Sequence, residues 1–149
     1  MAQIDQKAFT EGWIKHLMDS IDEHLDEETK IGLMESCGRA CARSGPVHAA
    51  RECQGNLDRW LATLRKWHGG EEYVQQDGDV VRLVCTECLC PAAKDIPEGL
   101  SDTYCYCSLG WMKETFGAVM GKPVGVELIQ SIKRGGEKCE FVIQSVGIL

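Results

Sequence analysis

Apolar residues in the first 70 positions recur at the spacing of amphipathic helices. Over residues 6–25 an apolar residue stands at every fourth position, which predicts a first helix. A second helix is predicted over residues 28–43, because three acidic residues at 26–28 complement the positive end of a helix dipole. Pro46 suits a first helical position, and from Val47 to Trp67 the apolar residues are three or four apart. We therefore expect one long third helix, ended by Gly69-Gly70.

Beyond residue 70 the apolar period shortens to two, which is typical of strands. Residues 73–76 and 79–85 are predicted to form a hairpin through Asp77-Gly78. A fourth helix is predicted over residues 108–120, with Ser108 as its N-cap. A second hairpin should follow, with strands around 124–132 and 139–143 joined at Gly135-Gly136.

The register of this last hairpin has two solutions. A two-residue turn would put Cys139 on the apolar face and Glu127, opposite Gln144, on the other face. A bulge beside the glycines would reverse this for one strand. Either way, the pattern predicts an α+β fold: one domain over residues 1–149, with a helical part (1–70) packed on a cysteine-rich antiparallel sheet part (71–149).

Composition and charge exclude several classes of function. The chain has 149 residues and a formal net charge of −7 without a basic stripe, so nucleic acid is not an expected partner. No apolar run approaches the roughly 20 residues of a membrane span, and the first residues do not resemble a signal peptide. We therefore expect a cytoplasmic protein. In a reducing cytosol, nine cysteines indicate metal ligation, redox chemistry or core packing rather than disulfides.

The cysteines are concentrated between residues 85 and 111, where two Cys-x-Cys pairs bracket a loop. Cys88/Cys90 and Cys105/Cys107 could converge on one soft metal ion, so a zinc site is predicted, with an iron–sulfur cluster as the alternative cofactor. Cys37 and Cys41 project from one helix face and are equally consistent with ligands or with small core residues. Cys53, in the middle of an apolar stripe, is predicted to be a core residue.

Two other functions remain open at this point. A thiol-dependent hydrolase or reductase acting on a small molecule would use Cys107 as its reactive thiol, because the start of a helix lowers the pKa of a cysteine. Alternatively, the helices and the last hairpin could enclose a small apolar molecule, with tryptophans as walls. The candidates for such walls are Trp13, Trp60, Trp67 and Trp111.

Residues 104–143 resemble the 4-vinyl reductase domain, a family that includes the sensor domains of phenol-responsive transcription regulators. The shared features are a cysteine before a glycine-containing helix, a Val-x-Glu strand, a glycine turn and a Cys-x-Phe strand. The resemblance implies a small hydrophobic ligand pocket, pairing into a homodimer, and a structural zinc. Its ligands would be Cys105 or Cys107, Glu127 and Cys139; Ser131 stands near the position of a further family cysteine. The CGRAC and Cys-Leu-Cys-Pro segments resemble small uncharacterised bacterial cysteine-rich proteins instead.

Overall fold

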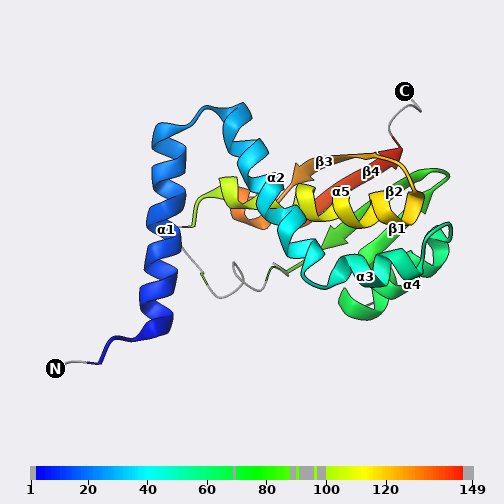
Figure 1. Cartoon of the computed structure of the whole chain (residues 1–149), viewed down its shortest axis with the longest axis horizontal. Coiled ribbons are helices and arrows are strands. Elements are labelled where there is room, and N and C mark those ends of the chain that lie inside the picture. The colour runs from blue at the N-terminus through cyan, green and yellow to red at the C-terminus, as the bar shows by residue number, and fades with distance from the viewer. Residues whose placement is uncertain (1–2, 69, 88–89, 91–95, 97–99, 146–149) are drawn as a thin grey trace.

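The computed structural model describes residues 3–68, 70–87, 90, 96 and 100–145, which form helices on one side of a single sheet (Figure 1). The helices are α1 (Gln6–His24), α2 (Glu27–Arg43), α3 (Pro46–Glu52), α4 (Leu57–His68) and α5 (Tyr106–Met120). The strands are β1 (Val74–Asp77), β2 (Val80–Cys85), β3 (Val124–Gln130) and β4 (Cys139–Ser145). Three short 3-10 helices are η1 (Glu71–Tyr73), η2 (Asp102–Cys105) and η3 (Ile132–Arg134).

The four strands form an antiparallel sheet in the order β1-β2-β4-β3. Apolar side chains alternate along β2 and β4 and face α4 and α5, so one face of the sheet carries the core. The core is densest around Trp60 of α4, Phe116 of α5 and Leu83 of β2, each at most 1% exposed. The predicted α+β class, with N-terminal helices and a C-terminal pair of strands, is confirmed.

Helices α2 and α5 cross with their backbones in direct contact, and two glycines make this possible. A Cβ on Gly38 would lie 1.8 Å from the carbonyl oxygen of Cys107, and one on Gly110 would lie 1.9 Å from that of Glu35. Only residues without a side chain permit so close an approach. Ion pairs flank the crossing: Lys113 bonds Glu35 at 2.7 Å, and Glu114 accepts hydrogen bonds from two arginines of α2, Arg39 and Arg43.

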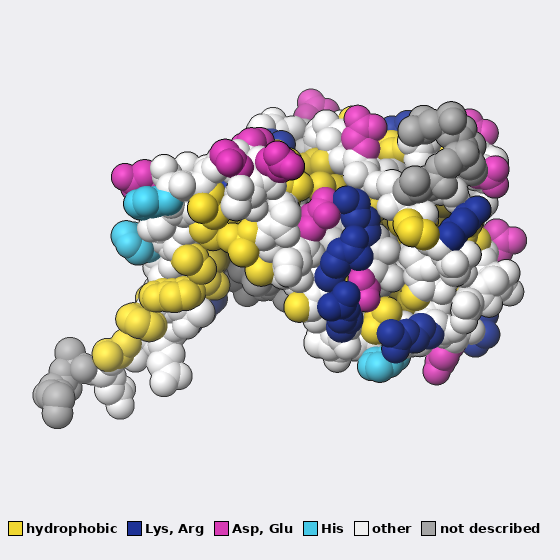
Figure 2. Space-filling model, turned by 45° about the horizontal axis from the view of Figure 1, so that its top comes forward, with side chains coloured by type: hydrophobic (Ala, Val, Ile, Leu, Met, Phe, Trp, Pro, Cys, Tyr) yellow, Lys and Arg dark blue, Asp and Glu magenta, His cyan; other side chains and the backbone are white. Residues whose placement is uncertain are grey.

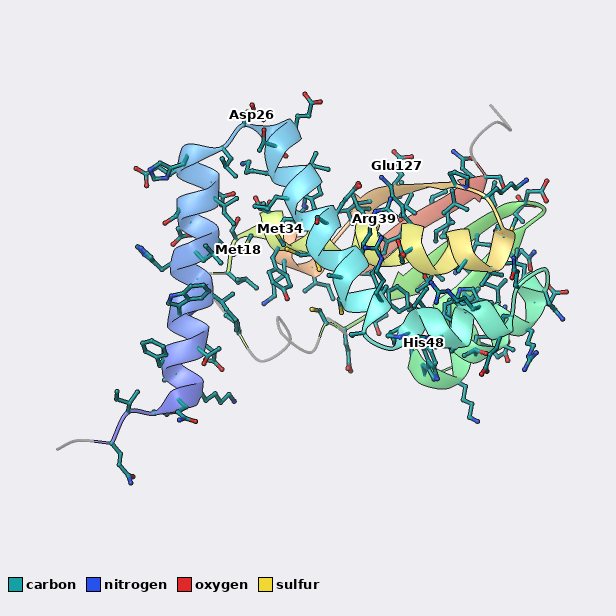
Figure 3. All side chains as sticks on the ribbon, viewed as in Figure 1. Met18, Asp26, Met34, Arg39, His48 and Glu127 are labelled. Atoms are coloured by element: carbon teal, nitrogen blue, oxygen red, sulfur yellow. The ribbon has the colours of Figure 1, made fainter. Side chains whose placement is uncertain are left out.

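Helix α1 extends away from the sheet (Figure 1). Its Met18 packs with Met34 of α2 in a small second cluster, and Figure 3 shows both side chains in the angle between the two helices. The predicted helix is confirmed, but most of its apolar stripe is not buried: Phe9 is 62% exposed and Trp13 57%. Figure 2 shows hydrophobic side chains in a row along this part of the molecule. Among the described residues, no helix has both the length and the apolar character to cross a membrane.

The single helix predicted from Pro46 to Trp67 is wrong, because the chain breaks after Glu52 into α3 and α4. Gly55 takes a positive φ of 79°, and its amide bonds the carbonyl of Val119 at 2.8 Å. The Asn56 side chain then accepts a hydrogen bond from the Arg59 amide at 3.0 Å, as an N-cap does. The apolar period continues across the break because both helices face the same core.

The ends of α5 and of the last hairpin also differ from prediction. Helix α5 begins at Tyr106, with Cys105 rather than Ser108 as its N-cap. The last two strands are joined through η3 and not by a two-residue turn, and Ile129 forms a bulge between the Leu128 and Gln130 pairings. In the observed register Glu127 lies opposite Val142, on the face of the sheet away from Cys139.

Candidate thiol site

Four cysteines from three segments of the chain gather where α2 crosses the start of α5. Cys37 and Cys41 stand one turn apart on α2 and are exposed, so core packing does not account for them. Gly38 between them touches the carbonyl of Cys107, in the first turn of α5. The half-buried Cys90 thiol lies 3.6 Å from the hydroxyl of Tyr104, one residue before the N-cap of α5. We call Cys37, Cys41, Cys90 and Cys107 the helix thiol group.

The neighbouring thiols also affect the ionisation of Cys107. Burial raises the pKa of the Cys107 thiol to about 12, and the nearby thiols of Cys90, Cys41, Cys37 and Cys105 raise it further in the same direction. Burial likewise raises the pKa of the Tyr104 hydroxyl, together with its bond to Cys90. The prediction that the helix start lowers the pKa of Cys107 is therefore wrong, because burial and the neighbouring thiols raise this pKa.

A second set of thiols lies on the other side of the start of α5, against the sheet. Cys85 at the end of β2 lies directly opposite Cys139 at the start of β4. The Cys139 sulfur accepts a hydrogen bond from the Ile132 amide at 3.4 Å, and the Cys105 thiol bonds the hydroxyl of the buried Ser131 at 3.4 Å. We call Cys85, Cys105 and Cys139 the sheet thiol group.

Sequence reasoning missed Cys85 and Tyr73 as neighbours of Cys139. Burial raises the pKa of the Tyr73 hydroxyl, as do its hydrogen bond to Cys85 and the nearby Cys139. The alternation of β2 could have indicated Cys85, because it places residues 81, 83 and 85 on one face. Its pairing with Cys139 required the strand order, which the sequence does not contain.

The predicted ligands thus fall into several places. Cys105 bonds Ser131 beside the sheet, whereas Cys107 lies in the first turn of α5 with Cys90, Cys41 and Cys37 as further neighbours. Glu127 is exposed on the opposite face of the sheet from Cys139, so the ligand set implied by the 4-vinyl reductase resemblance is not assembled. Cys88 lies outside the described residues. Cys53 is buried in the core, as predicted.

Both thiol groups have the donor chemistry of a zinc or iron–sulfur site. Within the described ranges, no three side chains of Cys, His, Asp or Glu are close enough to hold a metal as they stand. For their sulfurs to reach coordination distance of one ion, the cysteine side chains would have to rotate toward one another. The exposed positions of Cys37 and Cys41 leave room for such a rotation.

The tryptophans that might have lined an apolar pocket take different positions. Trp60 is completely buried, with ring centroids of Trp67, Trp111 and Phe116 at 5.6, 6.5 and 6.2 Å. It therefore fills the core between α4 and α5. Trp13 lies on the exposed side of α1, away from this aromatic cluster.

The fold and its thiols define the class of the protein as a cysteine-rich α+β domain. The chain belongs to a family of unknown function (DUF6144), whose model matches residues 2–147. The match covers the helical part and the sheet part together, so the two parts belong to one family unit. No match was found among curated proteins.

Proposed function

We propose that this chain is a metal-binding, sensor-like domain in which the helix thiol group binds one thiophilic ion, with zinc as the expected metal. The observation that carries the proposal is the backbone contact between Gly38 and Cys107, because it brings the Cys37–Cys41 face of α2 alongside the first turn of α5. The protein would act in a reducing compartment such as the cytoplasm, where these thiols stay available.

The chemistry of the cluster favours a bound cation. Several thiols close together disfavour one another's ionisation, as the raised pKa of Cys107 illustrates. A metal ion reverses this effect because it binds the thiolate form and neutralises the shared negative charge. Four thiolates are a complete tetrahedral set for structural zinc, and they equally suit an iron–sulfur cluster.

The alternative of a thiol-dependent enzyme has less support. A Cys107 thiol with a pKa of about 12 is protonated at neutral pH, and the thiol form is a poor nucleophile. A bound metal would restore the thiolate but would also occupy it as a ligand. The 4-vinyl reductase resemblance and a homodimer stay predictions, as does the small apolar ligand.

The proposal is tested by the metal content and the visible spectrum of protein purified anaerobically without chelator. We expect about one zinc per chain and no colour. Replacement by Co²⁺ should then give the strong visible absorption of a tetrahedral thiolate site. If the protein instead contains iron and sulfide and is brown, the helix thiol group binds an iron–sulfur cluster in place of zinc.

Variants identify the site within the chain. Cys41→Ser and Cys107→Ser should lose the metal, whereas Cys53→Ala should keep it because Cys53 is buried in the core. Cys139→Ser should also keep it and so separates the sheet thiol group from the helix thiol group. Metal-free protein, or equal metal loss in all four variants, would overturn the proposal.

A further inference from the structure

A basic groove runs between α2, α3 and the C-terminal half of α5, ending at the start of β3. Its volume is about 600 Å³, which lies within the range of small-molecule sites. Arg39, Arg51, Lys113 and Lys122 line it together with one carboxylate, Glu114, so its formal charge is +3 in a chain of −7. Figure 2 shows Lys and Arg side chains in a band across the middle of the molecule, and Figure 3 places Arg39 where α2 crosses α5.

Part of this charge is already used within the fold, and part is not. Arg39 bonds Glu114 at 3.1 Å, and Lys113 bonds Glu35. Arg51 and Lys122 are exposed, and in the part of the chain that the structure describes neither has an acidic partner. The side-chain amide of Gln54 also lines the groove and adds a further donor.

The end of α5 does not cancel this positive potential. Its C-terminus at Gly121 carries roughly half a negative charge from the helix dipole. The two positive charges of Arg51 and Lys122, which remain after the ion pairs of Arg39 and Lys113, are together several times larger. Between the cations the groove has apolar positions, with Val47 and Val124 buried at its base and Ala118 half-buried.

We propose that this groove binds a small organic anion whose phosphate or carboxylate group is held by Arg51, Lys122 and Gln54. Its apolar part lies over Val47, Ala118 and Val124. Arg51 offers the planar donor pair that matches either anion, and Lys122 adds a point charge. The site lies beside the helix thiol group on the same two helices, and the anion binds there with or without a metal, although a bound metal would strengthen the binding.

The test is calorimetric titration of the full chain, as purified, with phenyl phosphate, benzoate and inorganic phosphate. We expect saturable binding of phenyl phosphate or benzoate, tighter than that of inorganic phosphate because the ring covers the apolar base. Arg51→Glu and Lys122→Glu should each weaken binding about tenfold or more, since each removes a charge-assisted hydrogen bond. Comparing phenyl phosphate with benzoate identifies the anionic group.

Lys66→Glu is the matched control, because it makes the same change of charge at an exposed lysine of α4 outside the groove. It should leave the affinity unchanged. Circular dichroism confirms that each variant is folded. Absence of binding by every probe would overturn the proposal, and so would an equal loss of affinity in Lys66→Glu or binding of inorganic phosphate as tight as that of the organic anions.

Discussion

The close crossing of α2 and α5 makes Gly38→Ala a decisive substitution. The added Cβ would lie 1.8 Å from the carbonyl oxygen of Cys107, whereas real Cβ atoms essentially never come within 3.0 Å of a non-bonded atom from another part of the chain. The opposing atom belongs to a helix backbone, so no rotamer change can relieve the overlap. The two helices would have to separate by at least the difference, 1.2 Å.

Two effects of opposite sign decide the stability of this variant. Alanine stabilises a helix interior by about 1 kcal/mol relative to glycine. Overpacking a well-packed contact costs about 1–3 kcal/mol, and here the separation also stretches the 2.7 Å bond between Lys113 and Glu35. We expect a net loss of about 1–2 kcal/mol, because a backbone overlap lies at the costly end of that range.

Urea unfolding, monitored by circular dichroism, measures this change as a shift of the unfolding midpoint while the dependence of the unfolding free energy on urea stays constant. Gly32→Ala is the matched control on the same helix, because nothing lies within 4 Å of its added Cβ. It should gain about 0.5–1 kcal/mol. On α5, Gly110→Ala should be destabilising, and Gly117→Ala, with its nearest neighbour at 3.6 Å, should be tolerated.

The double variant Gly38→Ala/Gly110→Ala provides a further check. One separation of the helices relieves both overlaps, so the combined loss should be smaller than the sum of the two single losses. Equal stability of Gly38→Ala and Gly32→Ala would refute the close backbone contact between α2 and α5. Full additivity of the two single losses would contradict the shared separation.

Two further predictions concern the same core and crossing. The hydrogen bond from Arg43 holds the pKa of Glu114 below its usual 4.5, so this pair stabilises the fold above that pH, and its contribution is lost as the pH falls through the lowered value. In Glu114→Gln the urea midpoint should fall less steeply as the pH is lowered through this range. An unchanged pH dependence would contradict the role given to Glu114. Trp60→Ala should lower the free energy of unfolding by about 3–5 kcal/mol because Trp60 is completely buried. Trp13→Ala should change it by no more than about 0.5 kcal/mol because Trp13 is exposed. Equal losses of stability in thermal unfolding would disprove the placement of α1.

Much of the fold follows from local signals in the sequence. Asp77-Gly78 lies at the first hairpin, where Gly78 takes a φ of 60°, and the 28–43 helix lies within one residue of α2. The break at Gly55 was missed because the apolar period continues through it, although Gly55-Asn56 is itself a stop followed by an N-cap. The exposure of Phe9 was missed because periodicity reports that a stripe exists and not what covers it.

The candidate site depends on long-range geometry that periodicity does not contain. Cys37 and Cys41 were correctly placed on one face of a helix, but whether that face meets Cys107 depends on how α2 crosses α5. The signal for the crossing was present in Gly38 and Gly110, since glycine inside a helix is costly unless close packing requires it. The side of the sheet taken by Glu127 depended on the hairpin connection and on the bulge at Ile129.

The helix pair connects the two proposed sites, and this connection can be measured. Residues 35–43 of α2 supply thiols, the contact glycine, and the arginines that bond Glu114 at the groove. An ion bound by Cys37, Cys41 and Cys107 would fix the spacing of α2 and α5, and so also the width of the groove. Removal of the metal should therefore weaken binding of the organic anion, and by linkage the anion should tighten metal binding by the same factor. Titration of the anion into metal-loaded and chelator-treated protein gives the ratio of the two anion affinities. Competition with a chelator, with and without saturating anion, gives the ratio of the two metal affinities. Equal ratios above one would establish the coupling, whereas identical anion affinity in both forms would show that the glycine contacts alone hold the crossing.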